Sequence, residues 1–146
     1  MYVKSFKFSR RLAVACLAAL GILLIALVLL SGRGGGGSTD LDTTEGRVSY
    51  LKELGWEADP ASEVAQDVII PSTFTEVLEN YNQLQQEQGF DLTEYRGVRC
   101  TVYTYTLVYY PNSDCEAQAC LYIYKGQVIA GDIHSTAVDG FMHGLQ

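Results

Sequence analysis

Residues 116–132 read EAQACLYIYKGQVIAGD, and this stretch decides the fold. Lys125-Gly126 is a two-residue connection of the kind that needs positive φ, which is typical of a β-hairpin. Residues 116–124 therefore form one predicted strand, and a second follows the turn. The pairs that this turn sets opposite one another are Ile123 with Val128, Tyr122 with Ile129, and Leu121 with Ala130.

A third predicted strand, residues 98–110, comes before the hairpin, and the turn-rich run 111–114 connects them. One face of this strand carries Tyr103, Tyr105, Leu107 and Tyr109, and the other carries Val102, Thr104, Thr106 and Val108. If the strands pair about the 111–114 turn, Cys100 lies opposite Lys125 and Cys120 lies opposite Tyr105. The pattern therefore predicts an antiparallel meander.

Helical patterns lie further upstream. Thr43 or Thr44 caps a helix that ends at Gly55, after which residues 63–70 alternate as a half-buried strand. A capping box at Thr73 and Glu76 begins a second helix, which ends at Gly89. The apolar stripe of that helix is Phe74, Val77, Leu78, Tyr81 and Leu84. We expect one further turn, closed at Gly97, and a small two-layer α+β domain with both helices on one face of the sheet.

The N-terminal third of the chain has a different composition. Residues 12–30 contain no charged side chain and are long enough to cross a bilayer as a helix, so a lipid bilayer is the expected partner of this segment. Residues 1–11 carry Lys and Arg but no acid, which predicts a cytoplasmic N-terminus and an uncleaved single-pass anchor. Residues 31–42 form a Gly-rich linker, and residues 43–146 form the extracytoplasmic domain.

Charged side chains are also distributed unevenly along the chain. Residues 38–146 contain five Lys and Arg against seventeen Asp and Glu, a net charge of −12. Such a domain should be repelled by nucleic acid and by anionic lipid. We therefore expect no nucleic-acid partner.

Several short motifs occur in a characteristic order. They are Tyr50-Leu51-Lys52-Glu53-Leu54-Gly55-Trp56, Ile70-Pro71, Tyr81-Asn82-Gln83-Leu84, Gln88-Gly89-Phe90-Asp91-Leu92, Tyr95-Arg96-Gly97 and Val128-Ile129-Ala130-Gly131-Asp132. In these motifs the chain resembles the bacterial domain of unknown function family numbered 4830, over about residues 47–140. The resemblance implies a small, often membrane-anchored protein, and it implies no activity.

Both histidines lie near the C-terminus together with two acids. Asp132, His134, Asp139 and His143 are ligand types that could form a metal site. Ser135 adjoins His134, but no nucleophile elbow surrounds it. The residues therefore predict no enzyme activity and no cofactor, with a hydrolase or metal-dependent enzyme based on these four residues as the alternative.

Seven of the ten tyrosines lie between Tyr95 and Tyr124. One interpretation is a sheet core with hydroxyl groups at its margin. The other is an exposed platform for an envelope protein, a peptide or a glycan, formed by Tyr103, Tyr105, Tyr109, Tyr122 and Tyr124. The second interpretation predicts a binding module at the cell envelope.

Cys100, Cys115 and Cys120 lie in the predicted extracytoplasmic part, where disulfides are chemically permitted. Three is an odd number, so at most one bridge forms within the chain. The predicted strand pairing excludes Cys100–Cys120. We expect either a small Cys115–Cys120 loop or no bridge.

Overall fold

The computed structural model describes residues 39–111 and 114–146. Within these residues the helices are α2 (Thr44–Glu53) and α3 (Glu76–Glu87), and the short 3-10 turns are Pro60–Ser62 and Leu92–Tyr95. The strands are β1 (Val64–Ile69), β2 (Arg99–Thr106), β3 (Ala117–Tyr124), β4 (Gln127–Ser135) and β5 (Met142–His143). They form one antiparallel sheet in the order β1-β2-β3-β4-β5, which confirms the predicted meander.

The predicted tail 1–11, the anchor 12–30 and most of the linker 31–42 lie outside the described residues. Within residues 39–111 and 114–146, none of the helices combines the length and the apolar character that crossing a bilayer requires.

Both helices end as the sequence predicts. Gly55 has φ +95° and the Trp56 amide donates to Leu51 O at 2.9 Å, while Gly89 has φ +87° and Phe90 donates to Gln85 O at 3.0 Å. Glycine reaches these left-handed conformations without steric cost, so it ends each helix and turns the next aromatic residue back onto it.

The start of α3 differs from its prediction. The N-cap is Thr75, whose hydroxyl accepts from the Leu78 amide, and the predicted capping box at Thr73 is not formed. Thr75 still has an extended backbone, so the segment after Pro71 continues for longer before the first helical turn. The inward face of the helix also differs from the predicted stripe: Val77 is 79% exposed, whereas Asn82 and Gln85 are buried.

The register between β2 and β3 is one residue away from the prediction. Cys120 pairs with Thr104, and Tyr105 pairs with Ala119. The connection is longer than a four-residue turn, because β2 ends at Thr106 and β3 begins at Ala117. Since directly opposed residues share a face, this shift assigns Tyr105 to one face of the sheet and Cys120 to the other.

The β3–β4 hairpin follows its predicted register only near the turn. Lys125 and Gly126 both have positive φ, and Ile123 pairs with Val128 as expected. A β-bulge then shifts the register, so that Tyr122 pairs with Ala130 and Cys120 pairs with Asp132. The predicted Tyr122–Ile129 and Leu121–Ala130 pairs are therefore wrong, because Ile129 is the extra residue on β4.

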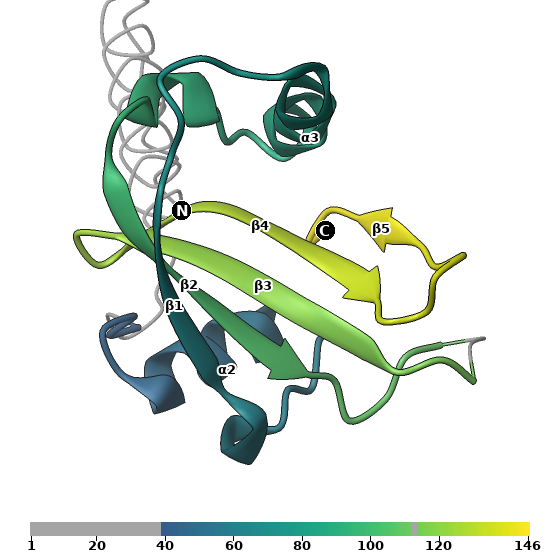
Figure 1. The fold of residues 1–146 in the computed structure, drawn as a ribbon. Coiled ribbons are helices and arrows are strands. Elements are labelled where there is room, and N and C mark those ends of the chain that lie inside the picture. The colour runs from purple at the N-terminus through teal and green to yellow at the C-terminus, as the bar shows by residue number, and fades with distance from the viewer. Residues whose placement is uncertain (1–38, 112–113) are drawn as a thin grey trace, which may run out of the picture. The chain divides into compact units, whose positions relative to one another are not determined.

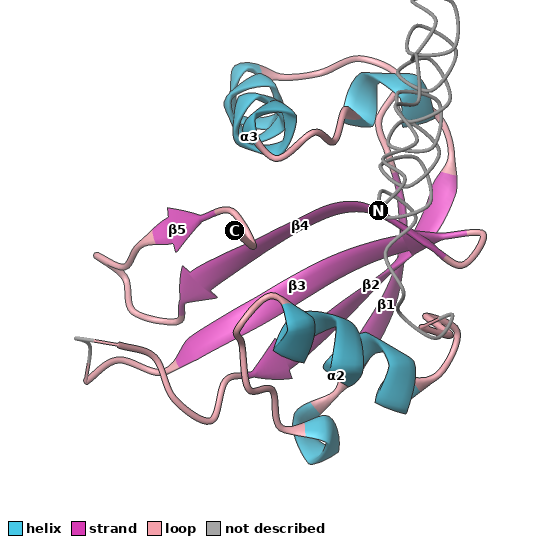
Figure 2. Ribbon diagram, turned by 180° about the vertical axis from the view of Figure 1, so that it is seen from behind, coloured by secondary structure: helices cyan, strands magenta, loops and turns pink. Residues whose placement is uncertain are grey.

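The two helices lie on opposite faces of the sheet, not on one (Figures 1 and 2). Leu51 of α2 belongs to the core cluster that contains Tyr105, Ala119 and Leu121. Leu78 and Tyr81 of α3 pack on the other cluster, which contains Cys100, Ile129 and Ala130. The two-layer prediction is wrong because β3 is apolar on both faces and each face requires a cover.

An ion pair between buried Arg47 and partly exposed Glu63 connects α2 to the sheet. Arg47 is 3% exposed, and its Nη2 lies 3.0 Å from Glu63 Oε2 while its Nε donates to Tyr105 Oη at 2.8 Å. The Tyr105 hydroxyl also donates to Glu63, and the guanidinium lies 3.6 Å from the centre of the Tyr103 ring. Paired in this way, the arginine is tolerated inside the domain.

The pKa of Glu63 predicts how stability depends on pH. Burial alone raises the pKa of this carboxyl, but hydrogen bonds from Tyr105 and Arg47 outweigh it and hold the pKa below the ordinary value of 4.5. The stabilisation is therefore present above pH 4.5 and is lost as the pH falls through the lower, folded-state pKa. We expect Glu63→Gln to cost about 1–2 kcal/mol at pH 7 and much less in acid. Urea unfolding of the unsubstituted protein and of Glu63→Gln, at pH 7 and at an acidic pH below the folded-state pKa of Glu63, tests this. An equal loss of stability at the two pH values would contradict it.

Candidate functional site

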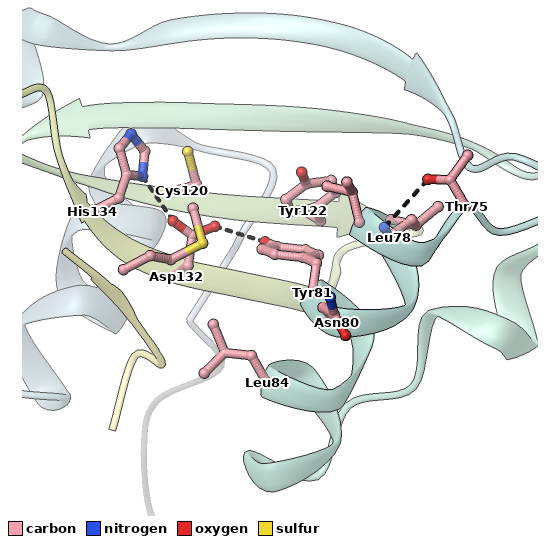
Figure 3. A pocket seen from close by; sticks show the side chains of 11 residues that line it. Thr75, Leu78, Asn80, Tyr81, Leu84, Cys120, Tyr122, Asp132 and His134 are labelled. Carbon is pink, nitrogen blue, oxygen red and sulfur yellow. Dashed lines mark hydrogen bonds and ion pairs between the residues drawn. The ribbon is translucent and has the colours of Figure 1, made fainter. Parts of the chain in front are cut away.

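A cavity of about 730 Å³ lies between α3 and the adjoining strands (Figure 3). Its walls come from the start and middle of α3 and from the strand residues that face this helix. The lining residues are Thr75, Val77, Leu78, Asn80, Tyr81, Leu84, Cys120, Tyr122, Asp132, His134 and Met142. An apolar pocket with a few convergent polar groups is the usual form of a small-molecule site.

Asp132 is the polar centre of this pocket. It is 3% exposed, and each carboxylate oxygen has its own partner. Oδ2 accepts a hydrogen bond from the Tyr81 hydroxyl at 2.6 Å, and Oδ1 lies 2.7 Å from His134 Nδ1 (Figure 3). The carboxylate therefore connects α3 to β4 and fixes the orientation of the imidazole.

These contacts change the acidity of the groups around Asp132. The hydrogen bond to Asp132 raises the pKa of His134, although partial burial opposes this. Burial, reinforced by the negative charge of Asp132, raises the pKa of the Tyr81 hydroxyl far above its ordinary value. At neutral pH Tyr81 is therefore a hydrogen-bond donor and not a phenolate.

Cys120 lies directly across from Asp132 on β3. Its Sγ lies 3.2 Å from Thr104 Oγ1, and burial together with the Asp132 charge raises the pKa of the thiol to about 11. One ligand atom from each of Cys120, Asp132 and His134 lies within 4.8 Å of the other two. A thiol, a carboxylate and an imidazole thus meet at one end of the pocket.

Apolar side chains form much of the remaining pocket wall. Leu78 and Leu84 are half-buried on α3, Val77 of the same helix is mostly exposed, and Met142, which is paired with His134, is also mostly exposed. Exposed apolar side chains that border a concave surface are characteristic of a binding site.

Of the four predicted metal ligands, the structure brings together only Asp132 and His134. His143 lies opposite Ile133 on β5, and its Nε2 is 2.9 Å from the Tyr110 hydroxyl. Its ring contacts Trp56, Tyr110 and Phe141. Asp139 is exposed in the β4–β5 connection. The four-residue site is therefore not formed, because the short β5 strand directs His143 away from His134.

The predicted tyrosine platform is also divided. Tyr103 and Tyr105 belong to the core under α2, where Tyr105 has no exposed surface, while Tyr122 and Tyr124 face α3. Tyr109 is exposed beyond the end of β2. Strand alternation and the shifted β2–β3 register place these five tyrosines on different faces, so they form no common surface. Of the five, only Tyr122 lines the pocket.

The predicted Cys115–Cys120 bridge is absent from the described residues. Ala117 and Cys120 are three residue steps apart on an extended strand, a separation of about 10 Å. That distance exceeds the Cα separation of a disulfide, so a bridge back to Cys115 would require the start of β3 to unfold.

Taken together, the fold and the pocket define a class: a small α+β meander domain with a helix on each face of the sheet and an apolar pocket under the second helix. A family model described as Domain of unknown function (DUF4830) matches residues 50–133, and the chain belongs to this family. Neither a curated protein nor a solved structure matches the chain.

Two residues of the site were missed from the sequence. Tyr81 was predicted only as part of an apolar stripe, and Cys120 only as a disulfide partner. A weak signal existed for Cys120, since it lies on the same strand face as Tyr122 and Tyr124. Nothing local indicated that Asp132 would be opposite it, because that pairing depends on the bulge.

The Tyr81–Asp132 hydrogen bond predicts the effect of one hydroxyl group. Tyr81→Phe should lower the free energy of unfolding by about 1–3 kcal/mol, because the buried carboxylate loses a donor. Tyr109→Phe removes a hydroxyl from a side chain that is 68% exposed and should change stability by less than about 0.5 kcal/mol. Chemical denaturation of both variants measures the difference, and equal effects would contradict the role of Tyr81.

Proposed function

We propose that this domain is a binding module that takes up a small ligand in the pocket between α3 and strands β3 and β4. The ligand has an apolar body, which fits against Leu78, Leu84 and Tyr122, and a polar head directed at Asp132 and His134. The observation that carries the proposal is a cavity of about 730 Å³ with largely apolar walls and a polar cluster at Asp132 and His134. This volume is in the usual range for small-molecule sites.

The state of the thiol favours binding over nucleophilic catalysis. Cysteine attacks as the thiolate, and a pKa of about 11 keeps Cys120 protonated at neutral pH. The imidazole of His134 is already engaged by Asp132, which suits a hydrogen-bonding or ionic contact with a ligand head.

We further propose that the domain acts outside the cell, attached to the membrane by residues 12–30. The uncharged composition of this segment and the basic residues before it support this arrangement. The acidic net charge of residues 38–146 is also compatible with a domain kept away from an anionic lipid surface.

A charge at the pocket rim should weaken binding. The probe is N-phenyl-1-naphthylamine, a fluorophore with apolar rings and one N–H donor. We expect saturable binding to the full-length chain, weakened at least about tenfold by Val77→Asp, because a charge at the mouth opposes entry of apolar rings. Val64→Asp makes the same change at an exposed position on β1 and should have no effect. Absence of saturable binding, or equal weakening by both variants, would contradict the proposed pocket.

The proposed orientation has its own test. Protease added to intact cells should remove a tag fused after Gln146 and spare a tag fused before Met1, because four basic residues precede the apolar segment. Immunoblots for the two tags, with lysed cells as the control, measure this. Protection of the C-terminal tag in intact cells would show that the orientation is wrong.

A further inference from the structure

We infer that Cys120, Asp132 and His134 form a binding site for a zinc-type transition-metal ion, with the remaining coordination position open to the pocket. The site shares Asp132 and His134 with the proposed organic ligand, but its test uses metal ions alone, so the failure of one proposal is distinguishable from the failure of the other. These residues come from two neighbouring strands, so the sheet itself fixes their spacing.

The geometry brings the donor atoms within reach of one ion. One atom each of Cys120, Asp132 and His134 lies within 4.8 Å of the others. Ligand distances to zinc are about 2.0–2.3 Å, so donors around one ion lie roughly 3–4 Å apart. His134 and Cys120 are only partly buried, so rotation of their side chains can bring the donor atoms closer together.

The chemistry of the donors selects the kind of ion. Thiolate and imidazole favour zinc and its neighbours over Mg²⁺ and Ca²⁺, which take oxygen ligands. Three protein ligands that leave a fourth position open are typical of zinc sites that bind an exchangeable ligand. All three residues line the pocket, so the open position would face it.

Outer contacts already orient two of the three ligands. The Tyr81 hydroxyl holds Asp132 Oδ2 at 2.6 Å and leaves Oδ1, which faces His134, as the oxygen for the ion. The Thr104 hydroxyl lies 3.2 Å from the Cys120 sulfur. Outer-shell partners of this kind fix ligand orientation in metal sites. On binding, the ion would replace the thiol proton of Cys120 and any proton shared between His134 and Asp132.

Cobalt is a suitable probe because it occupies zinc sites and is coloured. Titrating the full-length chain with Co²⁺ should give one equivalent bound per chain, with a thiolate-to-metal charge-transfer band that Zn²⁺ removes. Cys120→Ser should abolish the band and weaken binding at least about tenfold, and His134→Gln should also weaken binding. Tyr81→Phe should weaken it by about tenfold while leaving the band in place. Cys115→Ser, at an exposed cysteine outside the site, should leave both unchanged.

A second measurement needs no variant and therefore does not depend on whether the substituted chains fold. Zn²⁺ should slow alkylation of Cys120 by iodoacetamide without slowing that of Cys115, as measured by peptide mass spectrometry. Both results together support the site. Absence of stoichiometric binding, a band that survives Cys120→Ser, or equal alkylation of Cys120 with and without Zn²⁺ would overturn it.

Discussion

Strand β3 is apolar on both faces, and the arrangement of the domain depends on this constraint. Ala119, Leu121 and Ile123 face α2, while Cys120, Tyr122 and Tyr124 face α3. A sheet with one apolar face needs one layer of helices, but a central strand of this composition must be covered twice. The chain meets this need by placing α2 before the meander and α3 inside it, between β1 and β2 (Figure 1).

The β-bulge at Ile129 determines which chemistry lies under α3. In a regular hairpin set by the Lys125-Gly126 turn, Asp132 would lie opposite Ala119 and face the apolar core beneath α2, where a carboxylate is costly to bury. The extra residue changes the face of everything beyond it, so Asp132 lies opposite Cys120 and His134 opposite Gln118. One inserted residue thus produces both a continuous α2 core and a polar end to the pocket. Bulges are frequent beside functional sites for this reason.

The sequence predicted those features that depend on local chemistry. Helix ends at Gly55 and Gly89 and the turn at Lys125-Gly126 follow from positive φ, and the pairing of β3 with β4 follows from that turn. Features set by tertiary contacts were missed. The β2–β3 register depends on the long 107–116 connection, and the inward face of α3 depends on buried amides. Asn82 accepts from the Leu92 amide at 2.7 Å and Gln85 accepts from the Gly131 amide at 2.9 Å, so polar residues occupy positions that a hydrophobic pattern assigns to solvent.

Of the residues at the polar end of the pocket, the sequence placed Asp132 and His134 together because they are close in the chain. Tyr81 and Cys120 approach them only through the fold, so no local pattern placed them beside these two residues.

Helix α3 is attached to β4 largely through polar side chains, and this affects how the pocket can work. Tyr81 bonds Asp132, Gln85 bonds the Gly131 amide, and Gln88 donates to the Gly131 carbonyl at 3.1 Å. Directional bonds of this type hold the helix at a distance from the sheet, where close apolar packing would have filled the space beneath it. The same bonds make the helix sensitive to the site, because a ligand or ion that engages Asp132 acts on the carboxylate to which Tyr81 is bonded. Binding at the polar end, as proposed, would therefore act on the same buried carboxylate that holds this part of the pocket wall.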